Sequence, residues 1–231
     1  MERYSISFVL PMYNEAENIT DTLQKLTRMA LDICRDYEII VIDDASQDNG
    51  CRIVDDFISR DDHIKLVRLP KNTKFGGALH TGLKKASRPI IIYTDADLPV
   101  KEKKIKKGLE SLAGADIVTG YSLALKDSSF KRIIISRVYN FLVKFLFGLQ
   151  IKDINSGFKI YRAEALHDMK LYSRSPFIDT EIFVEALKKN YRIKQFGLIF
   201  DLRTKGKSTV ARPTIIARTF WDMLAYKFRS R

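Results

Sequence analysis

The sequence predicts an α/β fold with a mostly parallel central sheet and helices on both of its faces. Short apolar runs alternate with helix-patterned segments of about a dozen residues, which is the order of βαβ units. Ile90–Thr94 opens with four consecutive apolar residues, as expected for a strand that is buried on both faces. The chain has 231 residues, of which 45% are hydrophobic, and this is enough material for one large core.

The first half of the chain alternates strands and helices strictly. The expected strands are Ile6–Leu10, Glu38–Ile42, Ile64–Leu69 and Ile90–Thr94, and the expected helices are Glu15–Ala30, Ser46 to about Ser59 and Gly76 to about Ala86. The first strand should stop at Pro11, and Asn14 and Ser46 are the expected N-caps of the first two helices. Right-handed crossovers would place the loops that follow these strands at one edge of the sheet.

The second half should extend the sheet and add amphipathic helices. The expected strands are Asp116–Gly120, Phe158–Tyr161 and Arg192–Leu202, and the expected helices are Phe130–Phe147, Asp179 to Asn190 and Pro213–Arg231. The first and last of these helices mix large apolar residues with basic ones. No repeat, low-complexity tract or clear linker is visible, so a single domain over residues 1–231 is the simplest partition.

The composition restricts the partners and the compartment. A formal net charge of +12 predicts polyanionic partners, namely nucleic acid, anionic lipid head groups or phosphorylated small substrates. Cys34 and Cys51 fall where buried helix positions are expected, which favours reduced structural thiols in a reducing compartment. We see no signal peptide, and the most apolar segment, Ile133–Leu149, is interrupted by Arg137 and Lys144. A soluble or peripheral protein is therefore expected.

Two carboxylates, Asp95 and Asp97, follow the apolar run directly. Ligands of open α/β sheets bind beyond the carboxyl ends of the strands, and two carboxylates placed there repel each other unless a cation or a proton separates them. Mg²⁺ favours one or two carboxylates together with phosphate oxygens. The loops Pro11–Glu15, Asp43–Gln47 and Asp95–Asp97 are thus expected to form one nucleotide and metal site, and the alternative for the last loop is a solvated turn.

Other nucleotide-binding motifs are missing. The first turn, PMYNEAEN, contains no glycine, which excludes a Rossmann dinucleotide site. Gly206-Lys207-Ser208 matches the end of a Walker phosphate loop but lacks the upstream glycine and the preceding strand.

At this point the chain resembles the family-2 inverting glycosyltransferases of GT-A type, and more narrowly the dolichyl-phosphate (polyprenyl-phosphate) mannose and glucose synthases. The matching stretches follow the order of the family over nearly the whole chain. They are LPMYNEAENI (Leu10–Ile19), IIVIDDASQDNG (Ile39–Gly50), NTKFGGALHTGLKKA (Asn72–Ala86), YTDADLP (Tyr93–Pro99), DINSGFKIYR (Asp153–Arg162), DTEI (Asp179–Ile182) and the basic glycine loop Arg203–Ser208. The C-terminal stretch WDMLAYKFR looks closer to the glucose-transferring branch.

The resemblance implies a GT-A (Rossmann-like) fold and a role for each matching segment. Residues 1–120 would form the nucleotide-sugar-binding half, residues 121–211 the acceptor-binding half and residues 212–231 a basic amphipathic C-terminal helix. The residues implied for the donor side are Pro11, Tyr13, Glu15, Ile42, Asp43 and Asp44 as the wall for base and ribose, Gly76 and Gly77 at a helix start, Asp95, Ala96 and Asp97 as the Asp-x-Asp motif, and Arg203. Asp95 and Asp97 would hold Mg²⁺ or Mn²⁺, with Asp97 as the more direct ligand.

The resemblance also assigns an acceptor side. Arg132 and Ser136 lie four residues apart, hence on one helix face, and match a pair that the family aims at the acceptor phosphate; simple solvation of Arg132 is the alternative. Arg132 is counted with Asp95 and Asp97 among the catalytic residues. Glu181 is placed on the acceptor side as well.

Three departures from the family pattern concern metal and diphosphate binding. Pro99 occupies the position of a third metal ligand, so water is expected there. Thr119–Ser122 contains no arginine for the diphosphate, and Thr209 stands where a lysine is expected, for which Lys205 or Lys207 would compensate.

The implied reaction is metal-dependent, inverting transfer of a hexose from UDP-glucose or GDP-mannose to a polyprenyl or dolichyl phosphate, giving a β-linked lipid-phosphate sugar. A phosphate monoester has a second pKa of about 6 and needs no general base; if a base exists, the choices are Asp153, Asp179 and Glu181. The basic helices would hold the enzyme on the cytoplasmic face of a membrane. The alternatives are a glycosyltransferase with a non-lipid acceptor and a non-catalytic basic nucleotide- or nucleic-acid-binding protein. Nucleic acid is not the expected partner, because the acidic loops would repel it.

Overall fold

The computed structural model describes residues 3–229 apart from residues 99, 124–129 and 201–212, and for residues 130–133 it describes the backbone alone. One seven-stranded sheet runs through this described part, in the order β3-β2-β1-β4-β6-β5-β7. The strands are β1 (Tyr4–Met12), β2 (Cys34–Asp43), β3 (Ile64–Arg68), β4 (Ile90–Thr94), β5 (Ile117–Ser122), β6 (Phe158–Arg162) and β7 (Ile193–Leu198). Only β6 runs antiparallel to its neighbours β4 and β5.

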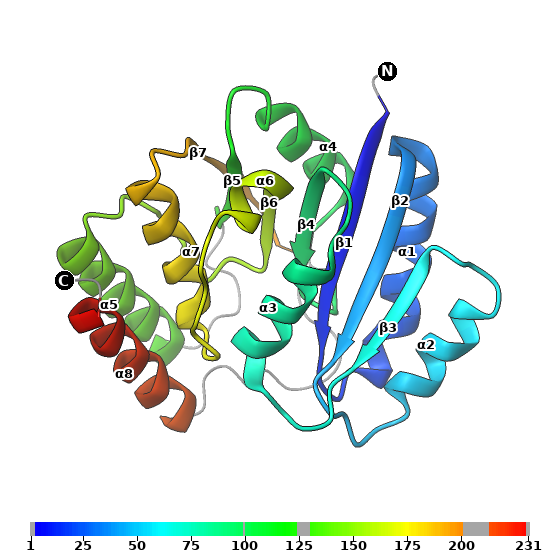
Figure 1. Ribbon diagram of the computed structural model, residues 1–231, viewed down its shortest axis with the longest axis horizontal. Helices are drawn as coiled ribbons and strands as arrows, with labels where there is room; N and C mark the ends of the chain where they lie inside the picture. The colour runs from blue at the N-terminus through cyan, green and yellow to red at the C-terminus, as the bar shows by residue number, and fades with distance from the viewer. Residues whose placement is uncertain (1–2, 99, 124–129, 201–212, 230–231) are drawn as a thin grey trace.

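Helices cover both faces of the sheet (Figure 1). One layer consists of α1 (Ala16–Ile33), α2 (Gly50–Ile58) and α4 (Glu102–Ser111), and the other of α3 (Lys74–Lys85), α5 (Phe130–Phe147), α6 (Ala163–His167), α7 (Phe177–Lys188) and α8 (Pro213–Arg229). Successive strand residues point to opposite layers, because Phe8 and Ile92 belong to the first core and Val9 and Tyr93 to the second. The prediction of an α/β fold with a mostly parallel sheet and helices on both faces is confirmed.

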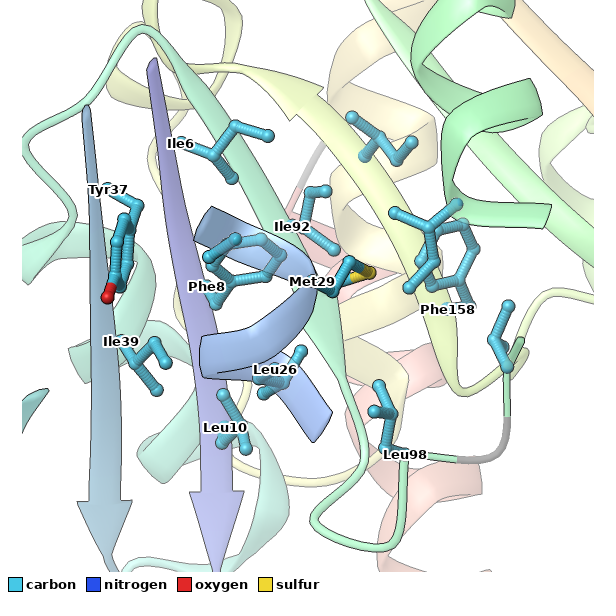
Figure 2. Packing of buried hydrophobic residues seen from close by; sticks show 14 of the residues in the cluster. Ile6, Phe8, Leu10, Leu26, Met29, Tyr37, Ile39, Ile92, Leu98 and Phe158 are labelled. Atoms are coloured by element: carbon cyan, nitrogen blue, oxygen red, sulfur yellow. The ribbon is translucent and has the colours of Figure 1, made fainter. Parts of the chain in front are cut away.

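The core on the α1 side continues to the end of β4. Figure 2 shows residues of this cluster from β1, β2, β4, β6 and α1, and also Leu98, which follows the two carboxylates. Leu98 is 8% exposed. Burying this side chain removes apolar surface from water, which stabilises the turn that carries Asp95 and Asp97.

The antiparallel direction of β6 matters for the site. A strand that runs backwards starts at the edge where its parallel neighbours end. Phe158, the first residue of β6, pairs with Thr94, the last residue of β4. The segment just before β6 therefore lies at the carboxyl edge of the sheet beside the Asp95–Asp97 turn.

Several predicted boundaries were wrong. The strand β1 does not stop at Pro11 but pairs with β2 as far as Met12. The proline is tolerated because β1 pairs with β4 only up to Val9, so the ladder on that side has already ended. The helix α2 begins at Gly50 rather than at Ser46, and the N-cap position of α1 is Glu15 rather than Asn14.

Further differences concern the second half and the cysteines. The helix α3 begins at Lys74, the helix α6 was not expected, and β7 ends at Leu198. Cys34 opens the strand β2 instead of lying in a helix; burial raises the pKa of its thiol to about 12 and that of Cys51 to about 11. Both thiols are free, as predicted. Among the described residues, no helix is long and apolar enough to cross a bilayer.

Candidate functional site

The loops after β1 and β2 are bound to each other at the carboxyl edge of the sheet. The backbone N–H of Asn14 donates to Oγ of Ser46 (3.0 Å), and the backbone N–H of Gln47 donates to Oδ1 of Asn14 (2.8 Å). The backbone N–H of Ala16, at the start of α1, donates to Oδ2 of Asp48 (2.8 Å). The two residues expected to cap helices, Asn14 and Ser46, instead link the two loops, so the predicted convergence of these loops is confirmed.

Left-handed backbone conformations gather at the same edge. Five non-glycine residues of the described chain have positive φ, and four of them follow consecutive parallel strands: Asn14 (φ 55°), Ala45 (φ 60°), Lys74 (φ 68°) and Leu98 (φ 40°). Such residues cost free energy in the folded state and cluster at ligand-binding sites. The strain therefore marks this edge as the functional one.

Asp43 and Asp44 are both buried at the end of β2. Asp43 accepts a hydrogen bond from the backbone N–H of Ser46 (3.1 Å). Oδ1 of Asp44 accepts hydrogen bonds from the backbone N–H and the hydroxyl of Thr73 (2.5 and 2.8 Å). Burial raises the pKa of Asp44, although the hydrogen bonds from Thr73 oppose that shift. Asp44 thus fixes the loop that begins α3.

The other residues predicted for the nucleotide wall differ in their exposure. Pro11, Tyr13 and Glu15 are half-buried along the loop after β1, where a bound ring or ribose can reach them. Ile42 is fully buried in the core on the α3 side, so any contact that it makes to a nucleotide comes from its backbone.

Gly76 and Gly77 lie in the first turn of α3 and have a packing reason to be glycine. The backbone N–H of Gly76 donates to the carbonyl of Arg174 (2.9 Å), and a Cβ at position 76 would lie 2.5 Å from the carbonyl oxygen of Ser175. A Cβ at position 77 would lie 2.5 Å from Oγ1 of Thr73. Gly76 lets the segment before α7 lie against the start of α3, and Gly77 leaves room for the side chain of Thr73.

Hydrogen bonds from several elements hold the turn after β4. The backbone N–H of Asp95 donates to the carbonyl of Gly157 (3.3 Å), and the backbone N–H of Leu98 donates to the carbonyl of Asp95 (3.0 Å). The hydroxyl of Thr22 in α1 donates to the carbonyl of Ala96 (2.7 Å), and the hydroxyl of Tyr93 donates to Oδ1 of Asp95 (2.5 Å). Asp95 and Asp97 remain half-buried, while Ala96 is buried. Pro99 lies outside the described residues.

A buried ion pair lies behind this turn. Lys159 of β6 is 0% exposed, and its Nζ lies 3.1 Å from Oδ1 of Asp179 in α7. Burial raises the pKa of Asp179 to about 6; Lys159 lowers it, and the charges of Asp95 and Asp153 raise it further. Burial also raises the pKa of Asp153, and Lys159 again opposes the shift. We did not single out Lys159 from the sequence; the only signal is a lysine within the otherwise apolar strand FKIYR.

The residues expected on the acceptor side are not brought together in the described part of the structure. Arg132 and Ser136 are four residues apart in α5; Ser136 is exposed, and the Arg132 side chain is not among those described. Arg203, Lys205, Lys207 and Thr209 also lie outside the described residues. At the end of β5, Nζ of Lys152 lies 4.3 Å from the centroid of the Tyr121 ring, so a cation stands beside the segment that lacks the expected arginine.

Glu181 has a structural partner. It is 1% exposed, and its carboxylate accepts hydrogen bonds from the backbone N–H groups of Tyr172 (3.0 Å) and Ser173 (2.9 Å). Burial raises its pKa, while these two backbone hydrogen bonds lower it. Its predicted contact with an acceptor phosphate stays a prediction.

The donor set at the edge fits a hard divalent cation. Within the described residues, no group of three His, Cys, Asp or Glu side chains can hold a metal ion alone. Asp95 and Asp97 supply oxygen ligands only, and Mg²⁺ or Mn²⁺ bound there would complete its coordination with phosphate oxygens and water. The arrangement suits a cation that arrives with a phosphorylated ligand.

The chain is similar to known glycosyltransferases in sequence and in fold. The family described as "Glycosyl transferase family 2" matches residues 7–170. Glycosyltransferase AglD of Haloferax volcanii is 28% identical over 233 residues, which cover 94% of this chain and 37% of that protein. The undecaprenyl-phosphate 4-deoxy-4-formamido-L-arabinose transferase of Pseudomonas fluorescens is 28% identical over 228 residues, which cover 90% of this chain and 67% of that protein.

Solved structures of the same fold contain a nucleotide and a metal. Glucosyl-3-phosphoglycerate synthase from Mycobacterium tuberculosis, in complex with Mn²⁺, UDP and phosphoglyceric acid, superposes with a TM-score of 0.76 at 16% identity, covering 97% of this chain and 78% of that chain. The same enzyme with Mg²⁺ and UDP gives a TM-score of 0.73 at 14% identity, covering 96% and 79% of the two chains. At this identity the likeness establishes the GT-A fold.

Proposed function

The chain belongs to glycosyl transferase family 2, and from that membership we propose that it transfers a hexose from a nucleotide-diphosphate sugar to a polyprenyl or dolichyl phosphate at a membrane surface. The observation that carries the proposal is the turn Asp95–Asp97, which hydrogen bonds hold at the same carboxyl edge as the linked loops after β1 and β2. The undecaprenyl-phosphate transferase of P. fluorescens, by its name, supports a lipid phosphate as the acceptor. UDP-glucose and GDP-mannose are the donors that we propose.

In this proposal, residues 1–120 bind the nucleotide sugar, residues 121–211 bind the acceptor and residues 212–231 contain the basic helix α8 (Pro213–Arg229), all within one domain. Pro11, Tyr13, Glu15, Asp43 and Asp44 face the base and ribose. Arg203 binds the diphosphate. Arg132 and Ser136, four residues apart in α5, bind the acceptor phosphate. Glu181 acts on this side through the backbone N–H groups of Tyr172 and Ser173 that its carboxylate holds.

Asp95 and Asp97 hold Mg²⁺ or Mn²⁺ together with the diphosphate of the donor. The bound cation supplies charge stabilisation for the leaving diphosphate. An oxygen of the lipid phosphate attacks the anomeric carbon, the bond from that carbon to the diphosphate oxygen breaks, and the configuration inverts. The nucleophile is mostly dianionic at neutral pH because its second pKa is about 6, so no protein base is required. Asp179 is a poor base because it is buried against Lys159.

The second support comes from α5 and α8, which lie side by side (Figure 1). Tyr139 and Phe220 are in edge contact (6.3 Å between ring centroids), as are Phe147 and Tyr226 (5.9 Å). Large apolar side chains of both helices nevertheless remain exposed: Ile134, Ile135, Val138, Phe141 and Phe145 on α5, and Trp221, Leu224 and Phe228 on α8. The same helices carry basic side chains, among them Lys144 on α5 and Arg229 on α8. We propose that this apolar face and these basic side chains contact the cytoplasmic leaflet of a membrane.

The proposal is tested with the purified protein, Mg²⁺, and UDP-glucose or GDP-mannose labelled in the sugar. Label should pass into the organic phase only when a short-chain polyprenyl phosphate is present, and from one of the two donors. Transfer to a phosphorylated water-soluble acceptor such as phosphoglyceric acid, without transfer to lipid, would instead support the alternative of a non-lipid acceptor. Binding of the donors without any transfer would support a non-catalytic nucleotide-binding protein.

A further inference from the structure

Lys159 is a charged side chain with no access to water. Its Nζ donates to the carbonyl of Ser156 (2.6 Å), pairs with Asp179 (3.1 Å) and lies over the rings of Tyr93 (5.2 Å) and Phe183 (6.0 Å). Asp179 itself is only 2% exposed. A buried ion pair is weak evidence for stability, because apolar side chains of similar volume often replace such a pair at no cost. The pair therefore calls for an explanation beyond packing.

Two sets of contacts connect this pair to Asp95. The first runs through the turn Ser156–Gly157, because Lys159 holds the carbonyl of Ser156 and the carbonyl of Gly157 accepts the backbone N–H of Asp95. Gly157 also lies so close to the Asp95 side chain that a Cβ at position 157 would overlap the carboxylate. This turn thus forms the wall against which Asp95 rests.

The second set runs through Tyr93. The ring of Tyr93 is fully buried under Lys159, and its hydroxyl donates to Oδ1 of Asp95. A lysine that fixes both the tyrosine ring and the glycine turn restricts Asp95 from two sides.

We propose that the Lys159–Asp179 ion pair is a positioning element that holds the carboxylate of Asp95 in the orientation required to bind a divalent cation together with a nucleotide diphosphate. The inference rests on the proposed function, because it takes Asp95 as a metal ligand. Lys159 touches neither metal nor substrate and acts through Tyr93 and the Ser156–Gly157 turn. Removing a group that orients a metal ligand in this way lowers the affinity for the metal by about 10- to 100-fold.

The test separates stability from metal binding. Lys159→Met removes the charge and fits a site lined by aromatic rings, and Lys159→Met/Asp179→Leu removes the whole pair and leaves no uncompensated buried charge. The binding of Mn²⁺ in the presence of UDP is measured by the electron paramagnetic resonance signal of free Mn²⁺, and the Tm is measured on the same samples. Lys65→Met is the matched control, because it also takes a lysine from a buried carboxylate, Glu38, in a pair that has no contact with Asp95.

We expect the single variant to lose both Tm and Mn²⁺ affinity, and the double variant to regain Tm while its Mn²⁺ affinity stays about 10-fold or more below that of the wild type. Lys65→Met should lower Tm alone. Recovery of both quantities in the double variant would overturn the proposal, because the pair would then serve only stability.

Tyr93→Phe provides a variant that keeps the ion pair in place if the double variant does not fold. It removes only the hydroxyl that binds Asp95, and Tyr161→Phe removes a second buried hydroxyl of the same core, one that has no hydrogen-bond partner among the described residues. Tyr93→Phe should weaken Mn²⁺ binding and Tyr161→Phe should not; equal binding by both would overturn the proposal. Asp95→Ala serves as the reference: if it binds Mn²⁺ and UDP like the wild type, the proposed metal site itself is wrong, which is a different failure.

Discussion

The hydroxyl of Tyr93 donates a 2.5 Å hydrogen bond to the carboxylate of Asp95, two residues further along the chain. The bond joins the last buried ring of β4 to the first carboxylate of the candidate metal site. The hydrophobic core is therefore in direct contact with that site at the end of β4.

The glycine turn beside Asp95 should be required for metal binding. Gly157→Ala places a Cβ where the Asp95 carboxylate lies, so the carboxylate must rotate away. We expect Mn²⁺ binding with UDP, measured by isothermal titration calorimetry, to weaken about 10-fold or more. Gly148→Ala is the control: its Cβ would meet no atom within 4 Å, and its cost is the strain of a residue with φ of 70°, which lowers stability by about 1–2 kcal/mol. Equal binding by the two variants would contradict the role assigned to Gly157.

The helix α1 should stabilise the Asp95–Asp97 turn through one hydroxyl. Thr22→Val removes the donor to the buried carbonyl of Ala96, which we expect to cost about 1–3 kcal/mol in urea unfolding. Thr27→Val is the matched control on the same helix, because the buried hydroxyl of Thr27 has no hydrogen-bond partner. That variant should be neutral or slightly stabilising, and a larger loss for Thr27→Val than for Thr22→Val would refute the prediction.

Sequence reasoning succeeded where a single local pattern determines the structure. Ile90–Thr94 was predicted with its observed bounds, because an apolar run between charged segments fits a strand buried on both faces. The bounds of α5 were also correct. Asp95 and Asp97 could be placed at the carboxyl edge for the same reason, since they follow this strand directly.

The sequence did not indicate features that depend on residues distant along the chain. Ser46 has a good capping side chain, but it binds the N–H of Asn14 across 32 positions instead of starting a helix. Nothing in FKIYR indicates that β6 runs antiparallel, because side-chain alternation is the same in either direction. The burial of Lys159 could not be predicted, because a lysine in a short strand normally points to water. Its partner, Asp179, comes from α7, which is distant in the sequence.

Acid should destabilise the pairing of β1 with β2 through Glu38. Its buried carboxylate accepts hydrogen bonds from Ser7, Lys65 and Ser87. Burial raises the pKa of Glu38, but these hydrogen bonds outweigh it and lower the pKa to about 2 from an ordinary 4.5. The folded pKa is below the unfolded one, so this stabilisation is complete above pH 4.5 and is lost as the pH falls towards 2.

The shift corresponds to about 3 kcal/mol. The difference in free energy of unfolding between the wild type and Glu38→Gln, measured with urea, should therefore shrink by about that amount between pH 5 and pH 2. Parallel curves for the two proteins over this range would show that Glu38 has no depressed pKa.

The exposed face of α5 and α8 should bind vesicles that contain anionic lipid. Phe145 is 76% exposed, and burying its ring in the interface is worth about 1.5–3 kcal/mol, so Phe145→Ser should reduce co-sedimentation about 10-fold or more. Leu31→Ser is the control, because Leu31 is 63% exposed on α1, in the opposite helical layer. Both variants should keep the wild-type Tm. Equal loss of vesicle binding in the two variants would show that this face is not the contact.

The most direct test of the central claim is the initial rate of sugar transfer to a short-chain polyprenyl phosphate as a function of Mg²⁺, for the wild type, Asp97→Asn and Asp62→Asn. Asp62 is an exposed carboxylate before β3, at the opposite edge of the sheet. We predict no transfer in EDTA, saturable recovery with Mg²⁺, and a rate for Asp97→Asn about 10²–10³-fold below that of the wild type, because several kcal/mol of charge stabilisation are lost. Asp62→Asn should match the wild type. Transfer that persists in EDTA, or in Asp97→Asn at the wild-type rate, would contradict the account.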